Sequence, residues 1–221
     1  MGTAGKVNGG GKPAATAGGT AAVDRIVAPA PTEIADLAAA CVRQVEAAVG
    51  VTLDFAPETL PLLDHYVTQA RASVHDRPEA LPLLAQSVGA YLGEVVRRRY
   101  VSWWGPLGDE PTDWQIQLET AYLVVRPVAL AHATLLRGEG GDDELPGDVD
   151  TSVLFGSLEL DEDDRARVAA RLAELPPVRE EEFWSTATML EVLDIAVDEI
   201  RAHRLGEGEP ELALGPEDYE D

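Results

Sequence analysis

The stretch GAYLGEVVRRRYVSWW, from Gly89 to Trp104, carries the densest information in this chain of 221 residues. It continues an apolar stripe that starts at Leu81 and recurs at the three- and four-residue spacing of one helix face. Gly89 and Gly93 lie along the edge of that stripe. Each glycine costs roughly 1 kcal/mol relative to alanine inside a helix, so both need a compensating reason. Close approach of another backbone is the simplest reason, and we predict a tight helix crossing or the floor of a groove.

The polar end of this stretch predicts a surface ion pair. Arg97 and Arg98 follow Glu94 at i+3 and i+4, which is the favourable order for pairs on a helix surface. We therefore expect Glu94 to point away from the apolar face into solvent, with an active-site acid as the alternative. Trp103 and Trp104 then begin a segment rich in aromatic and β-branched residues, which favours a strand.

A small sheet is predicted after the tryptophan pair. The turn-forming segment GPLGDEPTD is followed by WQIQL, in which apolar side chains alternate with two glutamines as in a half-buried strand. AYLVV reads as the next strand, and VALAHATLL reads as a helix that starts after Pro127. We predict an α+β fold that is mainly helical, with about five to six helices on a small antiparallel sheet.

The other helices are marked by their ends. Thr32 is a candidate N-cap and Gly50 a candidate stop for a helix whose apolar face includes Cys41, which we expect to be a buried small hydrophobe and not a nucleophile. A second helix begins near Pro57, and a third, LDEDDRARVAARLAEL, has Asp161 as its expected cap. The last, REEEFWSTATMLEVLDIAVDEIRAHRLG, has a wide apolar surface that includes Trp184. It is either the central helix of the fold or a contact with another chain, including a possible homodimer.

Composition divides the chain into three parts. Residues 1–30 are rich in glycine and alanine and are expected to be a disordered tail. Residues 31–205 form a single domain with an acidic loop at about 138–157, and residues 206–221 form an acidic disordered tail. Within that tail, ELALGPEDY places Leu212, Leu214 and Tyr219 among acids, as in a docking peptide for a basic, grooved partner.

Charge is distributed unevenly along the chain. The net charge is -23, and residues 139–221 contain 26 acids and 6 bases while residues 1–138 contain 14 acids and 11 bases. Such a surface repels phosphates, so nucleic acids and anionic membranes are disfavoured and a partner with a basic surface is favoured. A single cysteine excludes an internal disulfide, and no secretory signal or membrane-spanning run is evident. We expect a soluble cytoplasmic protein.

One resemblance is visible at the level of motifs. LDFAPETLPLLDHYV followed by GAYLGEVVRRRYVSWW resembles a family of uncharacterised bacterial proteins, with an LDFxPExLxxLD entry and a GAYLGEV helix. The match covers about residues 50–104 and extends more loosely to residue 137. The chain departs from that family in its long acidic second half. The resemblance implies a bacterial origin and a shared fold, without an activity.

No catalytic, cofactor-binding or metal-ligating constellation is evident. Asp148, Asp150, Ser152 and Glu159 match part of a calcium loop, but Val153 occupies the position that needs glycine. We therefore predict no cofactor, and a non-enzymatic interaction module, an adaptor or an acidic inhibitor of the immunity-protein kind, acting through the acidic half. The alternative is an enzyme or small-ligand binder with a cleft near Gly89 to Trp104. The candidate surface residues are Glu94, Arg97, Trp103, Trp104, Trp184, Leu212, Leu214 and Tyr219.

Overall fold

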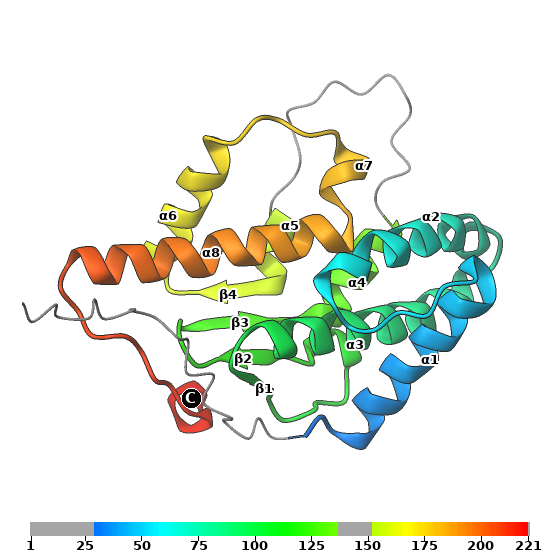
Figure 1. The fold of residues 1–221 in the computed structure, drawn as a ribbon, viewed down its shortest axis with the longest axis horizontal. Helices are drawn as coiled ribbons and strands as arrows, with labels where there is room; N and C mark the ends of the chain where they lie inside the picture. The colour runs from blue at the N-terminus through cyan, green and yellow to red at the C-terminus, as the bar shows by residue number, and fades with distance from the viewer. Residues whose placement is uncertain (1–28, 137–151, 221) are drawn as a thin grey trace, which may run out of the picture.

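Helices make up most of this fold, and a small antiparallel sheet joins them (Figure 1). The computed structural model describes residues 29–136 and 152–220. The α-helices are α1 (Thr32–Val49), α2 (Leu60–Asp76), α3 (Leu81–Arg99), α4 (Pro127–Leu136), α5 (Ser152–Ser157), α6 (Glu162–Ala173), α7 (Glu180–Phe183) and α8 (Thr186–Gly206). The strands are β1 (Ser102–Trp104), β2 (Ile116–Leu118), β3 (Leu123–Val125) and β4 (Leu158–Leu160). Short 3₁₀ turns occur at Pro57–Thr59, Pro78–Ala80, Pro111–Asp113 and Pro216–Tyr219. The predicted mainly helical α+β class is confirmed.

The four strands pair in chain order, each antiparallel to the next. One cross-strand row consists of Trp104, Ile116, Val125 and Leu158, and the neighbouring row consists of Trp103, Gln117, Val124 and Glu159. Because successive side chains in a strand point to opposite faces, the two rows lie on opposite faces of the sheet. The alternation predicted for WQIQL is confirmed, but its glutamine face is not open to solvent, since Gln117 is only 3% exposed.

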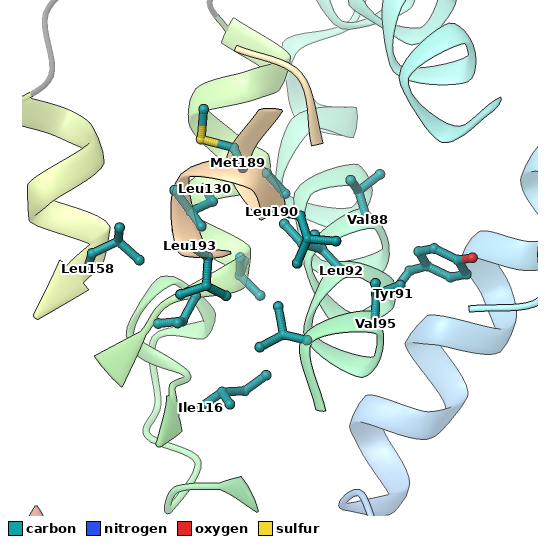
Figure 2. Close-up of a cluster of buried hydrophobic side chains, with 14 of the residues drawn as sticks. Val88, Tyr91, Leu92, Val95, Ile116, Leu130, Leu158, Met189, Leu190 and Leu193 are labelled. Carbon is teal, nitrogen blue, oxygen red and sulfur yellow. The ribbon is translucent and has the colours of Figure 1, made fainter. Parts of the chain in front are cut away.

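Helix α3 is the central element of the core. Every residue from Val88 to Val96 is buried, because α1 and α4 pack against this helix and the sheet face that carries Trp104 and Ile116 lies beside it. Figure 2 shows side chains of α3, α4 and α8 meeting those of β2 and β4, while Tyr91 points away towards α1. Each Leu, Ile or Val removed from water here contributes roughly 1.5–3 kcal/mol.

The entry to α2 is built around one strained residue. Phe55 has a φ of 65°, which is uncommon for a residue with a side chain. Its amide donates a hydrogen bond to the Tyr91 hydroxyl at 2.9 Å, and its ring stacks on the Tyr91 ring with centroids 4.7 Å apart. The Asp54 carboxylate accepts from the amide of Ala56 at 2.9 Å and from the hydroxyl of Thr59 at 3.2 Å. The Leu-Asp-Phe motif of the sequence is thus a turn that starts α2.

Several element boundaries differ from the sequence-based expectation. The predicted last helix is interrupted: α7 ends at Phe183, and α8 begins after Ser185, whose hydroxyl accepts from the amide of Thr188 at 3.1 Å. The expected caps Thr32 and Asp161 make no capping hydrogen bond through their side chains; Thr32 is already inside α1, after Pro31. Gly50 ends α1 as predicted, with a φ of 78°.

The acidic segments also differ from the prediction. The last residues of the expected loop at 138–157 form α5, which leads directly into β4. Residues 137–151, and residues 1–28 of the tail expected at 1–30, lie outside the described residues. Residues 207–220, expected to be disordered, fold back from the end of α8 to the sheet, where the C-terminal turn lies near β1 and β2 (Figure 1). We call residues 207–220 the C-terminal segment.

Candidate functional site

The glycine edge of α3 is a close-packing surface. A Cβ atom added at Gly89 would lie 2.5 Å from the Cα of Val128 and 2.9 Å from the carbonyl oxygen of Pro127, at the start of α4. At Gly93 the neighbour is the indole ring of Trp104 instead. The predicted close approach of a second backbone is confirmed at Gly89, whereas Gly93 makes room for a side chain.

Glu94 is buried, so the prediction of a solvated acid was wrong. The residue is 6% exposed, because the Trp104 ring that lies over Gly93 also covers its neighbour. One carboxylate oxygen, Oε1, accepts from Trp104 Nε1 at 2.9 Å and from Arg97 Nε at 2.8 Å, and Oε2 accepts from Arg97 Nη2 at 2.9 Å. Burial works to raise the pKa of Glu94, but the hydrogen bonds from Arg97 and Trp104 outweigh it and lower the pKa below its usual value. An ionised carboxylate with these partners joins α3 to β1.

The three arginines after Glu94 have three different sets of partners. Arg97 pairs with Glu94 as predicted, but Arg98 does not. The Arg98 guanidinium lies 4.0 Å from the centre of the Phe55 ring and donates to the Asp54 carbonyl at 3.1 Å. Arg99 forms a bidentate ion pair with Asp194 of α8, in which Nε and Nη2 each donate to a carboxylate oxygen at 2.6 Å. The basic run therefore connects α3 to the α2 entry and to α8. Glu94 and Trp104 form a hydrogen bond with each other. A ligand cleft in this region, the alternative drawn from the sequence, stays a prediction.

Trp103 lies on the second face of the sheet and contacts the C-terminal segment. Its Nε1 donates to Gln117 Oε1 at 2.7 Å, and its ring meets the Tyr219 ring edge-on at 6.0 Å. The Tyr219 ring stacks on Tyr122 with centroids 4.9 Å apart. The Tyr219 hydroxyl lies 2.6 Å from the carbonyl oxygen of Leu118, to which it donates, and burial raises its pKa to about 12.

The apolar residues of the predicted docking peptide face their own domain. Leu212 and Leu214 are half-buried, and the amide of Leu214 donates to the carbonyl of Glu119 at 2.9 Å. Two ion pairs hold the path of the segment, Arg201 with Glu211 at 2.9 Å and Arg204 with Glu209 at 2.8 Å. The expectation of a free peptide failed because α8 ends close enough to the sheet for its continuation to pack there.

Trp184 is fully buried, which corrects its place among the surface candidates. It lies in the break between α7 and α8, where its ring meets Phe183 edge-on at 5.2 Å and its carbonyl accepts from Arg71 Nη2 at 3.1 Å. Arg71 also donates to the carbonyl of Thr134 at the end of α4. The Trp184 region is thus a junction of α2, α4 and α8.

Sequence reasoning missed the residue that caps α8 from another helix. The Asp64 carboxylate of α2 accepts from the amide of Thr186 at 2.6 Å, from its hydroxyl at 2.7 Å and from the amide of Ala187 at 3.1 Å. These are the first residues of α8, where the orphan amides and the helix dipole favour a negative charge. Burial raises the pKa of Asp64 and outweighs the opposing hydrogen bonds. No local signal links two positions 122 residues apart in the chain.

An apolar groove of about 650 Å³ opens between α6, α8 and the connecting residues 174–179. We call it the α6–α8 groove. Its lining includes Phe155, Leu172, Leu175, Pro177, Val178, Phe183, Val192 and Ile195. Leu175 and Val178 are 38% and 39% exposed. The sequence signal for this surface was LAELPPV, residues 172–178, where apolar residues continue beyond the end of the predicted helix.

One acidic residue, Glu191, lies in the lining of the α6–α8 groove. It is exposed, and it enters none of the ion pairs found in the described part of the chain. Two nearby arginines are paired, Arg171 with Glu174 at 2.8 Å and Arg179 with Glu182 at 2.6 Å, and a third, Arg165, lies 5.9 Å from the centre of the Phe155 ring. Residues 152–206 contain 13 acids and 6 bases. The groove therefore combines an apolar floor with one exposed carboxylate, in a part of the chain that carries more acids than bases.

The lone cysteine and the partial calcium motif are the other candidates for chemistry. Cys41 is buried as predicted, and burial raises the pKa of its thiol to about 12, which disfavours the nucleophilic thiolate. Glu159, the last position of the partial calcium motif, pairs with Arg126 at 2.6 Å, while Asp148 and Asp150 lie outside the described residues. Within residues 29–136 and 152–220, no cluster of three or more His, Cys, Asp or Glu side chains could hold a metal ion. None of the helices in these ranges has the length and apolarity to cross a membrane.

Comparison with known proteins adds no assignment. No protein-family model, curated protein or solved structure matches this chain. The resemblance to an uncharacterised bacterial family stays a prediction.

Proposed function

We propose that this chain is a non-enzymatic protein–protein interaction module that acts through its acidic C-terminal half, as an adaptor or an acidic inhibitor. The observation that carries the proposal is the α6–α8 groove, where Leu175 and Val178 are partly exposed within an acidic region. Removal of apolar surface from water is the main favourable term in protein association. A partner that covers this groove would remove its apolar side chains from water, which would contribute favourable free energy to binding.

The charge of the chain supports a partner with a basic surface. Residues 139–221 carry 26 acids and 6 bases. Opposite charges accelerate encounter and select against acidic competitors, while nucleic acids and anionic lipids would be repelled. Since Leu214 and Tyr219 pack on the sheet, we assign the partner contact to the groove and not to the C-terminal segment.

Affinity capture from cells of the source organism tests the proposal. The tagged full-length chain is used as bait at about 0.1 M and about 1 M salt, between which the Debye length falls from about 10 Å to about 3 Å. We expect a basic protein to be retained at low salt and depleted at high salt. Chemical crosslinking of the same cells would show the same partner in place. Failure to retain any protein at either salt concentration, with no crosslinked product, would contradict the proposal.

A further inference from the structure

We propose that the α6–α8 groove binds a short amphipathic helix of a partner protein, with leucine-like side chains on one face and lysine or arginine flanking them. This inference rests on the proposed function and names the chemistry of the partner. It rests on three properties of the groove: its size, the elements that form its walls, and its charge.

The size of the groove fits one face of a helix. Its volume is about 650 Å³, and apolar side chains of α5, α6, α7 and α8 line it. Helices bound in grooves insert apolar side chains at i, i+3, i+4 and i+7, which together span about 10 Å of helix axis. Phe155, Phe183 and Val192 provide an apolar floor for such side chains.

The walls of the groove favour a helix over an added strand. Strand addition needs an open sheet edge with unpaired backbone groups. The walls here are α6 and α8, whose central amides and carbonyls are engaged within their own helices. Side chains are therefore what the groove mainly offers, and an amphipathic helix presents side chains alone.

The charge around the groove selects basic flanking residues. Glu191 projects from the wall formed by α8, so a lysine or arginine beside the apolar face of the bound helix would lie near it. Arg171 and Arg179, which could repel such a ligand, are each paired with a glutamate, and Arg165 lies over the Phe155 ring at the α5 end of the groove. An acidic amphipathic helix would face Glu191 and the net negative region around it.

A designed peptide can test this inference with the full-length chain. The probe is an 18-residue fluorescent peptide of leucine and lysine with leucine on one helix face. Two control peptides replace lysine by glutamate or place the same residues in strict alternation. Fluorescence anisotropy is measured for the wild type, the double variant Leu175→Gln/Val178→Gln, the charge variant Glu191→Gln and the matched control Leu83→Gln. Leu83 is 59% exposed on α3 and lies outside the groove lining.

We expect the leucine-lysine peptide alone to bind, the double variant to weaken it at least tenfold, and Glu191→Gln to weaken it about threefold. Leu83→Gln should leave the affinity unchanged. Leu175 and Val178 are partly exposed, so their replacement should preserve the fold, which circular dichroism can verify.

Four results would overturn the inference. One is equal affinity of the wild type and the double variant, which would place the peptide elsewhere on the acidic surface. Another is no binding of the leucine-lysine peptide. The third is a dimer, detected by light scattering, that dissociates in the double variant, since the groove would then hold a second copy of the chain. If the double variant still captures the cellular partner, the interaction function stands and the groove assignment fails.

Discussion

Replacement of Gly89 by alanine should destabilise the protein, although alanine is the better helix former. The new Cβ atom would lie 2.5 Å from Val128 Cα, 2.8 Å from Val128 N and 2.9 Å from Pro127 O. Carbon atoms in contact normally lie about 3.5–4.0 Å apart, so α3 and α4 would have to separate by about 1 Å at this crossing. All three atoms belong to the backbone of α4, and none can move away by a change of rotamer.

The expected magnitude follows from two opposing effects. Overpacking a well-packed site typically costs about 1–3 kcal/mol. We expect a value near the upper end, about 3 kcal/mol, because a backbone shift of α4 also disturbs buried Leu130 and Ala131. The higher helix propensity of alanine returns about 1 kcal/mol. The free energy of unfolding should therefore fall by about 2 kcal/mol.

Urea unfolding of the wild type and of Gly89→Ala measures this difference directly. The transition midpoint should fall while the slope with urea concentration stays the same, because the exposed surface on unfolding is unchanged. Gly206→Ala is the matched control, since nothing lies within 4 Å of its added Cβ and it is the last residue of α8. The control should be neutral or stabilising by up to about 1 kcal/mol. A Gly89→Ala protein as stable as the wild type would refute the close contact of α3 with α4.

Three other substitutions test the polar contacts. Glu94→Gln should lower the free energy of unfolding by about 1–3 kcal/mol at pH 7. Since the folded-state pKa of Glu94 lies below its ordinary 4.5, the stability advantage of the wild type should be full above that pH and disappear as the pH falls through the lowered pKa, as urea titrations between pH 7 and pH 3 would show. Tyr219→Phe removes the hydroxyl that bonds Leu118, so amide hydrogen exchange in residues 207–220 should accelerate several-fold; unchanged exchange would contradict the docking of this segment. Asp64→Ala leaves the amides of Thr186 and Ala187 without their carboxylate partner and should cost about 1–2 kcal/mol in thermal unfolding, whereas the exposed Asp36→Ala should cost little.

The contacts of Glu94 show what helix spacing can and cannot predict. Its partner at i+3, Arg97, was predicted correctly because the spacing alone brings the two side chains together. Its burial was not predicted, because it depends on where β1 places Trp104 after the chain has turned. The same spacing predicted Arg98 as a partner, yet Arg98 lies on Phe55, which comes from the entry to α2.

The predictions for the C-terminal segment and for Trp184 failed for a related reason. A run of acids with few apolar residues has a composition typical of disorder, and by composition residues 207–220 belong to that class. Their order depends on a few contacts, such as Tyr219 with Leu118 and Leu214 with Glu119, that exist only once α8 and the sheet are in place. Trp184 was assigned to a continuous helix surface, but the chain breaks there and turns the ring into the core.

Local periodicity was sufficient to predict the mainly helical α+β class, the buried faces of α1 and α3 and the antiparallel strands. These patterns arise from the residue repeat of each element and from the removal of apolar area from water. Tertiary structure alone decided which element covers which. It placed Asp64 at the start of α8, Val128 against Gly89 and the C-terminal segment against the sheet, and it opened the groove between α6 and α8. These contacts join residues far apart in sequence, and their geometry follows from the packing of whole elements, which no short-range pattern encodes.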